Sequence, residues 1–547
     1  MKSVFKVRYA VAGALSLVAA NAMALAPAAI DSSVVKLYVG GATATDGAVE
    51  NLFKLNTASG GVCVDGSLDI YYYKSSSGSI QNRTMFCTAN FSSAGTVTTN
   101  PIVANTTKIA VFKESQGGSA NGIVQVARGT PLQFLDFFSA SSNVVTVCAS
   151  ITSTPAASGN FSTYNTRDCG AASGVASTVV RTPAVGTPDG VNIIAPVAGV
   201  SDVDPGTFVG LGGVVGTDAS ALTRKRSSVG VTFNPIVSTA LYLALQKAQG
   251  LVAGTATVPD DSGIDKVPSL SASELRAVMT GNKFDSTSVY SNGVQLSTLA
   301  PTADTGLYVC RRGDTSGTMT SFKILFLDQG CAKNGASIGA FVSPDNSQGV
   351  NCTTAGCAWT TAYSADFVFA GAGSGDVRSC MDYQSSQGRF AIGTASTESK
   401  PNNTTSRWRF VRVDGQLPTL KSVMEGSYDY FTENTFNDKF PATATTGTQA
   451  IWDRLATNIG NKLVLDAVNS AWRNAAAIAR VDAVAPADTS QNGVADTGIL
   501  DIPQLSTNQP IFPVTANQVR TNAVNGQSRT YPGNPPNNCN RSYMLTP

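Results

Sequence analysis

Histidine is absent from this chain of 547 residues. It is the usual general base in nucleophilic catalysis and the commonest protein ligand of zinc and copper. Its absence excludes Ser-His-Asp and Cys-His catalysis and histidine-bound metal centres, and leaves only carboxylate or lysine chemistry. The expectation that the protein is not an enzyme, and has no catalytic residue, no metal and no cofactor, rests on the motifs described below.

Charged residues are also scarce, at 14% of the chain, and they nearly balance at a net charge of +2. Loss of Lys2, Lys6 and Arg8 with the first 24 residues would change that charge to −1. A nearly neutral chain is not typical of proteins that bind nucleic acid or membrane surfaces. No later apolar run is long enough to span a bilayer, so we expect no transmembrane segment in the mature chain.

Residues 1–24 have the pattern of a secretory signal peptide. Three basic residues precede the apolar run AVAGALSLVAA, and an A-x-A cleavage pattern follows at Ala22–Ala24, with Ala26 as an alternative cut. We expect the protein to be exported, to the periplasm or out of the cell.

Ten cysteines in an exported chain indicate disulfides rather than metal ligands or catalytic thiols. Sequence does not fix their connectivity, but neighbouring cysteines suggest Cys63–Cys87, Cys148–Cys169, Cys310–Cys331 and Cys352–Cys357. Cys380–Cys539 would remain and would tie the tail to the body.

Strand-like and helix-like segments alternate along the chain. VVKLYV (34–39), LDIYYY (68–73) and KIAVF (108–112) have the composition of strands, whereas 132–141 and 238–250 have helical patterns. Such alternation predicts an α/β fold, in which ligands bind at the carboxyl ends of the strands. A mature chain of roughly 520 residues is too long for one core and suits two lobes with insertions.

The segment RRGDTSGT, from Arg311 to Thr318, combines fixed positive charge, a carboxylate, hydroxyls and glycines. If Ser316 opens a helix, the first backbone N–H groups of that helix have no intrahelical acceptors and form an anion site. Arg312 would add a bidentate fork. The alternatives are a polar loop with a capping serine and, more weakly, an Arg-Gly-Asp adhesion tripeptide.

Three further motifs precede this segment, each at the end of an expected strand. They are LYVGGATATDGAVENLF (37–53), SQGGSANGI (115–123) and VAGVSDVDP (197–205). In this order, the four motifs resemble the type II periplasmic solute-binding proteins, and within them the phosphate-binding proteins of ABC importers and the related DING proteins. The similarity extends thinly over residues 33–435, and the tail beyond Asn437 has no counterpart.

The resemblance implies a two-lobe, periplasmic-binding-protein-like type II fold joined by a hinge, with insertions and disulfides. Lobe I would comprise residues 33–230 plus 393–547, and lobe II residues 231–392. The chain would cross between the lobes near 230–235 and return near 389–393. An insertion is expected at 142–187.

The resemblance also implies the residues of a phosphate site. They are Thr43, Ala44, Ser119, Asp202, Arg312, Asp314, Ser316, Gly317 and Thr318. In that family the aspartate of the last motif holds its arginine, so Asp314 is expected to hold Arg312. The duplicated Arg311 would face solvent or compete for the role.

Each proposed ligand also has a plain structural explanation. Thr43 would serve as a helix cap, Ser119 would lie in a flexible loop, and Asp202 would cap a helix or close a turn, with Asp204 as its rival. Asn121 stands where the family has a second glycine, so the loop around Ser119 is the weakest of the four matches.

An aspartate in such a site discriminates between oxyanions. An ionised carboxylate only accepts hydrogen bonds, so it suits HPO₄²⁻ or H₂PO₄⁻, which carry a proton, and not sulfate at neutral pH. With sulfate, Asp202 would remain a buried acceptor without a donor.

We therefore expect an exported solute-binding protein that captures inorganic phosphate for ABC-type uptake, with an ABC permease as its partner. The alternative is a secreted or cell-surface interaction protein that keeps the binding fold without transport. A phosphate-ester hydrolase ranks last, because no nucleophile is evident. Nearby aspartates would hold a metal only if they converge; these are Asp46, Asp202, Asp204 and Asp314.

Overall fold

The structure is a computed structural model that describes residues 30–467 with gaps. The longer gaps are at 75–79, 94–96, 138–147, 170–193, 301–304, 328–367, 401–406, 419–427 and 442–445. The predicted signal peptide, the tail from residue 468, most of the predicted insertion, and the cysteines at 331, 352, 357 and 539 lie outside the described residues.

The described chain has the mixed α/β architecture that the alternation predicts. A 13-stranded sheet runs in the order β13-β12-β14-β8-β17-β7-β1-β4-β3-β2-β6-β5, with β15 paired to β8. The strands are β1 Val35–Gly41, β2 Asp69–Lys74, β3 Ile80–Thr88, β4 Lys108–Glu114, β5 Thr152–Thr154, β6 Tyr164–Asp168, β7 Ala198–Ser201, β8 Thr223–Ser238, β9 Ser269–Leu270, β10 Tyr290–Ser291, β11 Val294–Gln295, β12 Leu307–Arg312, β13 Val368–Gly371, β14 Phe390–Ser396, β15 Trp408–Phe410, β16 Arg412–Val413 and β17 Phe431–Asp438.

Helices pack around this sheet. They are α1 Asp46–Lys54, α2 Val124–Arg128, α4 Pro205–Phe208, α5 Gly216–Ser220, α6 Thr239–Ala248, α7 Ala272–Met279, α8 Gly317–Phe326, α9 Ser374–Ser386 and α11 Gly447–Asn458, with a 3-10 turn, η3, at Ser119–Gly122. Among the described residues, none of these helices is both long enough and apolar enough to span a membrane.

The predicted strands at 34–39, 68–73 and 108–112 are confirmed as β1, β2 and β4, and the predicted helix at 238–250 as α6. The predicted helix at 132–141 is wrong over 132–135, which are irregular. There the backbone bonds to distant groups, since Leu132 N donates to Ile194 O (3.1 Å) and Asn82 Nδ2 donates to Gln133 O (2.7 Å). Tertiary bonds thus replace the local helical ones.

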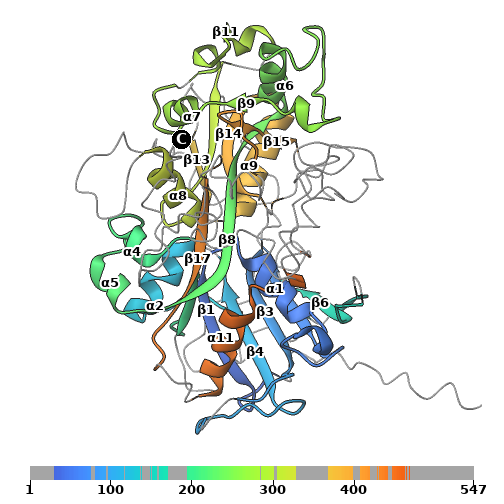
Figure 1. Ribbon diagram of the computed structural model, residues 1–547, viewed down its shortest axis with the longest axis vertical. Helices are drawn as coiled ribbons and strands as arrows, with labels where there is room; N and C mark the ends of the chain where they lie inside the picture. The colour runs from blue at the N-terminus through green and yellow to red at the C-terminus, as the bar shows by residue number, and fades with distance from the viewer. Residues whose placement is uncertain are drawn as a thin grey trace, which may run out of the picture.

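Strand β8 links two sections of the sheet. Its first part, up to Thr232, pairs with β17 in the lower section, which also contains β7, β1, β4, β3, β2, β6 and β5. From Phe233 it pairs with β14 in the upper section, together with β12, β13 and β15. In Figure 1, β8 rises from the lower part of the molecule to the upper part beside β17.

The predicted crossing at 230–235 falls where β8 changes partner. The predicted return at 389–393 covers the start of β14, which pairs with β12 and with β8. The chain enters the lower section at β17, which pairs with β7. The division into two lobes stays a prediction.

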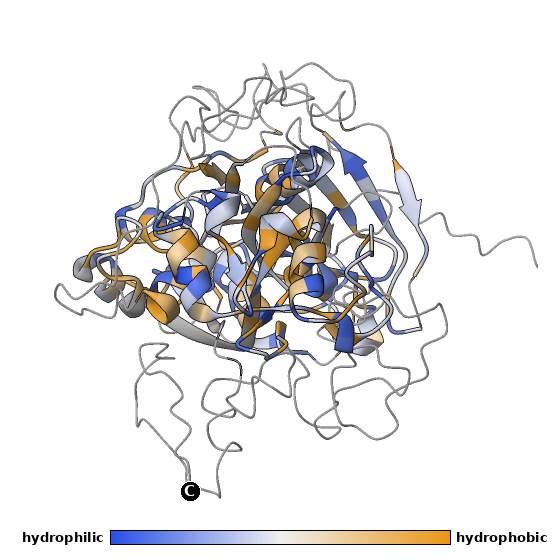
Figure 2. Ribbon diagram, turned by 90° about the horizontal axis from the view of Figure 1, so that it is seen from above, coloured by the Kyte–Doolittle hydropathy of each residue, from blue (hydrophilic) through white to orange (hydrophobic). Residues whose placement is uncertain are grey.

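The core is continuous between the sections. Its largest cluster includes Leu52 and Phe53 of α1, Phe233 and Tyr430 near the crossing, and Phe322 of α8. In the view from above, hydrophobic segments gather in the middle of the described body (Figure 2). Burial of each large side chain contributes about 1.5–3 kcal/mol, so this cluster holds the sections together.

The described disulfides correct part of the predicted connectivity. Cys63–Cys87 and Cys148–Cys169 are confirmed. Cys310 bonds to Cys380, with Cα atoms 5.9 Å apart, so the predicted pairs Cys310–Cys331 and Cys380–Cys539 are wrong. Proximity in sequence fails here because the fold packs α9 against β12, which brings the two cysteines together.

A buried ion pair links β6 to its neighbour β2. β6 lies parallel to β2, and Arg167 Nη2 is 3.2 Å from Asp69 Oδ2, with both side chains at most 3% exposed. Strand β3 lies between this pair, on β2 and β6, and strand β4. Removal of the Arg167 charge therefore serves as a control for the loss of a buried cation elsewhere in the sheet.

Candidate functional site

The predicted site residues follow the carboxyl ends of parallel strands. β1 runs parallel to β4 and β7, so their ends share one edge of the lower section. Thr43, Ser119 and Asp202 come after these three strands, in that order. Arg312 ends β12, which runs parallel to β13 and β14 in the upper section. The topology thus places residues from distant motifs at adjacent edges.

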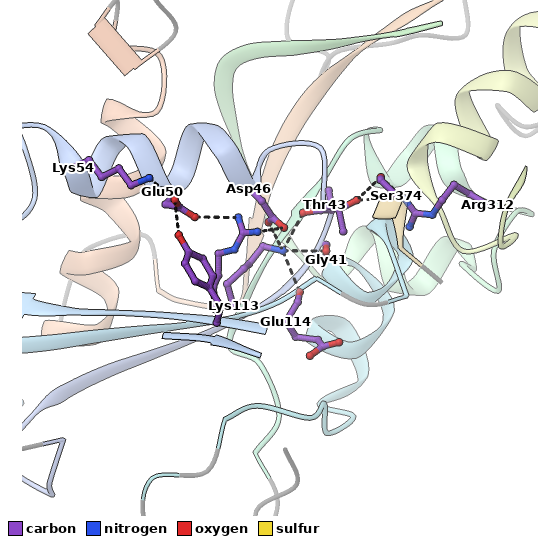
Figure 3. A network of polar contacts seen from close by, with 12 residues as sticks. Gly41, Thr43, Asp46, Glu50, Lys54, Lys113, Glu114, Arg312 and Ser374 are labelled. Atoms are coloured by element: carbon purple, nitrogen blue, oxygen red, sulfur yellow. Dashed lines mark hydrogen bonds and ion pairs between the residues drawn. The ribbon is translucent and has the colours of Figure 1, made fainter. Parts of the chain in front are cut away.

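Arg312 joins the two sections. Its side chain is buried, and Nη1 donates to Thr43 Oγ1 (3.2 Å) and to Ser374 Oγ (2.9 Å), as Figure 3 shows. Burial lowers the pKa of Arg312, and attraction to Asp376 and then to Asp202 offsets part of that effect. An arginine stays protonated in proteins, so a fixed positive charge lies inside this interface.

Ser119 and Asp202 form a closed pair of hydrogen bonds. Asp202 N donates to Ser119 Oγ, and Ser119 Oγ donates to Asp202 Oδ2, both at 3.0 Å. Asn434 Nδ2 of β17 donates to Asp202 Oδ1 (3.2 Å). Burial raises the pKa of Asp202 to about 6, although Ser119 and Arg312 favour its ionised form.

The rival carboxylate, Asp204, has a structural role. Its Oδ1 accepts from Gly206 N (2.8 Å) and caps the short helix α4. Asp202 is the one that faces Ser119. The structure therefore separates two aspartates that the sequence leaves as alternatives.

Helix α8 begins where the sequence predicts, with Ser316 as its N-cap and Gly317 as its first residue. The first backbone N–H groups of a helix lack acceptors within it. Ser316 Oγ is buried and has no hydrogen-bond partner, and Thr318 is also buried. The start of α8 therefore offers donors in a water-poor environment.

Glycines allow the two sections to touch here. A β-carbon added at Gly317 would lie 2.3 Å from Ser119 Oγ and 2.7 Å from Asp202 Oδ2. A β-carbon added at Gly118 would lie 2.8 Å from Ser316 Cα. Ala120 N also donates to Thr315 O (3.0 Å). The start of α8 therefore packs directly on the loop after β4.

We expect Gly317→Ala to push α8 away from Ser119 and Asp202. Overpacking of this kind costs roughly 1–3 kcal/mol, so urea unfolding should show a loss of about 2 kcal/mol. Gly313→Ala is the matched control, because the nearest atom to its β-carbon, Gly371 O, is 3.8 Å away. Equal stability changes in the two variants would contradict this packing.

Asp314 does not hold Arg312. Its side chain is 57% exposed and contacts Arg311 Nη1 (3.3 Å) and Lys323 Nζ (3.0 Å). Neighbouring side chains of a strand point to opposite faces, so Arg311 and Arg312 diverge. Arg311 is itself buried, and Nη1 also donates to Arg312 O (2.9 Å). It thus does not face solvent, and its guanidinium lies beside Asp314.

Thr43 and Ala44 lie in the turn between β1 and α1. Thr43 is half-buried and Ala44 is buried. Gly41 precedes them with φ of +113°, and a β-carbon there would lie 2.0 Å from Val200 O, so only glycine fits. The turn is therefore fixed against the end of β7.

Sequence reasoning missed three polar residues here: Ser374, Asn434 and the buried lysine Lys113. Ser374 lies in GAGSGD (371–376), after a strand. Similar glycine- and serine-rich turns precede the other helices of the site, so this pattern could have identified Ser374 from the sequence. Asn434 and Lys113 lie within strands, where no sequence pattern marks them as site residues. Within the described ranges, no cluster of three acidic or cysteine residues forms a metal-binding arrangement.

No protein-family model matches the chain, and no curated protein matches it. An ABC-type phosphate transport receptor from Vibrio cholerae is 12% identical, with 50% of this chain and 78% of the receptor covered and a TM-score of 0.28. A putative phosphate ABC transporter substrate-binding protein from Clostridium perfringens was solved with bound phosphate. It is 12% identical, with 52% of this chain and 80% of that protein covered and a TM-score of 0.27. PstS from Borrelia burgdorferi is 12% identical, with 50% of this chain and 78% of PstS covered and a TM-score of 0.24. Similarity at these scores does not establish a shared fold.

Proposed function

We propose that the chain binds inorganic phosphate, as HPO₄²⁻ or H₂PO₄⁻, where the two sections of its sheet meet. The anion site comprises Thr43, Ala44, Ser119, Asp202, Arg312, Ser316, Gly317 and Thr318. The observation that carries the proposal is the burial of Arg312 between the hydroxyls of Thr43 and Ser374.

The donor set suits a tetrahedral oxyanion. Arg312 supplies a guanidinium, the start of α8 supplies backbone N–H groups, and Thr43, Ser119 and Ser316 supply hydroxyls. Ser316 Oγ already lacks a partner, so a bound oxygen would satisfy it. Asp202 is the one carboxylate of the set and would accept the proton of phosphate, which sulfate lacks.

The proposal includes two lobes that close on the anion. Lobe I would contain the lower section and lobe II the upper, joined at β8 and at the segment that leads into β17. Thr43, Ser119 and Asp202 would lie on one side, and Arg312 and Ser316–Thr318 on the other. An anion that contacts both sides stabilises the closed form by its differential affinity.

We further propose that the protein is exported and passes phosphate to an ABC permease. A second candidate, an exported interaction protein that no longer transports, is favoured by one observation. Asp202 Oδ2 is 2.7 Å from the place of a β-carbon on Gly317, so a carboxylate of the protein itself already faces the start of α8. In that candidate the interface is permanently closed.

Isothermal titration separates these candidates. The mature protein is unfolded in denaturant without reductant, dialysed and refolded to remove any bound anion, then titrated with phosphate and with sulfate at pH 7. We expect saturable binding of phosphate and none of sulfate. No heat with phosphate, from a sample that circular dichroism shows to be folded, would contradict phosphate binding and favour the closed interaction protein.

A further inference from the structure

A buried lysine lies beneath the turn that carries Thr43. Lys113 is on β4, and its side chain is 1% exposed. Nζ donates to three carbonyl oxygens, Gly41 O (3.0 Å), Ala42 O (2.9 Å) and Glu114 O (3.1 Å). Figure 3 shows it between the turn and Asp46. The ammonium group thus bonds to three backbone carbonyls, two of them in the turn.

These bonds set the direction of the turn. In a trans peptide the N–H points opposite to the C=O, and no cis bond occurs in the described chain. Because Ala42 O points at Lys113, the N–H of Thr43 points away from Lys113. The Thr43 side chain is in contact with Arg312, so the turn faces the anion site.

A network of ion pairs holds Lys113 in place. Asp46 Oδ1 is 3.3 Å from Lys113 Nζ, and Asp46 Oδ2 is 3.3 Å from Arg83 Nη2. Arg83 also reaches Glu50, which accepts from Tyr72 OH (2.7 Å). The charge of Lys113 acts at the site as well, since it favours the ionised form of Asp202.

Stability alone does not account for a lysine here. Burial of a cation costs several kcal/mol, and apolar residues of similar volume often replace buried ion pairs without loss of stability. Methionine would fill the same space on β4. What methionine cannot do is direct two successive carbonyls of the turn.

We infer that Lys113 is a positioning residue for oxyanion recognition, acting through the carbonyls of Gly41 and Ala42 on the backbone and side chain of Thr43. The inference rests on the proposed phosphate site. It also makes a claim about the ligand-free turn, which is testable whether or not phosphate binds.

The binding test is a double-mutant cycle by isothermal titration with inorganic phosphate. Lys113→Met should weaken binding about 30-fold, an order of magnitude taken from residues that orient the protein ligands of a metal. Thr43→Val should weaken it about tenfold. Because both act through one turn, the double variant should resemble Lys113→Met and not reach the roughly 300-fold loss expected of independent effects.

The control is Arg167→Met, which removes a buried cation from the remote Asp69 pair. It should leave phosphate affinity within about threefold, because additivity holds for distant sites. Unchanged affinity in Lys113→Met, an equal loss in Arg167→Met, or independent effects in the cycle would overturn the inference.

Hydrogen exchange tests the turn without phosphate. Ala42 N donates to Val200 O (2.8 Å) and Asp46 N to Thr43 O (3.1 Å), so both amides report its order. Their exchange should accelerate about tenfold or more in Lys113→Met and stay unchanged in Arg167→Met. If the Met variant does not fold, Lys113→Gln replaces it. Unchanged exchange at the turn overturns the inference even if the wild type binds no phosphate.

Discussion

Replacement of Arg312 by glutamine should weaken phosphate binding about a thousandfold, a loss of about 4 kcal/mol. The guanidinium is buried, and it contacts Thr43 and Ser374 directly. Removal of one partner from a buried charged contact leaves the other charge without compensation. Titration with phosphate at pH 7 measures the effect.

Arg311→Gln is the matched control for this change. Arg311 adjoins Arg312 on β12 and is equally buried, at 2% exposed, but it contacts Asp314. The control should fold and keep its affinity within about threefold, because its side chain leaves β12 on the face opposite to that of Arg312. Similar losses in both variants would mean that general positive charge, and not Arg312, attracts the anion.

Asp202→Asn should stabilise the ligand-free protein at neutral pH by about 3 kcal/mol. The pKa of Asp202 is about 6 in the folded chain, against an ordinary value of 3.8. Below about pH 4 the carboxyl is protonated in both states, so it costs no stability. As the pH rises towards 6, the unfolded chain releases its proton first, and stability falls. Asparagine does not ionise and avoids this loss.

Urea unfolding of the anion-free protein at pH 4 and pH 7 measures this difference. The gap between Asp202→Asn and the wild type should be small at pH 4 and largest at pH 7. Asp314→Asn is the control of opposite sign. Burial alone would raise the pKa of Asp314, but Arg311 and Lys323 hold it below its usual range, so its loss should destabilise the protein at pH 7. A pH-independent gap for Asp202→Asn would show that its carboxyl is not perturbed.

Local patterns in the sequence predicted the parts of the site that are made locally. Ser316, Gly317 and Thr318 begin a helix as their spacing indicates, because a helix start depends on adjacent residues. The burial of Leu52 and Phe53 also follows from the pattern of α1. Strand ends, glycine turns and helix starts are therefore predictable from the residues alone.

Contacts made by the topology were not predictable in this way. Cys310 and Cys380 are 70 residues apart, and they meet because α9 packs against β12. Ser374 reaches Arg312 through the same packing. The pairing of Asp314 with Arg311 depends on which face of β12 each arginine occupies. Pairings of this kind require strand order and side-chain direction, which composition and spacing do not contain.

The position of β17 in the sheet governs when the protein can assemble during synthesis. This late strand lies between β8 and β7, so the lower part of β8 finds its neighbour only after Asp438 has been made. Until then, the parallel strands β1, β4 and β7 of the lower section are not joined through β17 to the upper section, which contains β12. Unpaired strand edges of this kind are prone to aggregate. We therefore expect Arg312 and Thr43 to meet only after β17, the last strand of the described residues, has been made, so that a shorter nascent chain lacks the site.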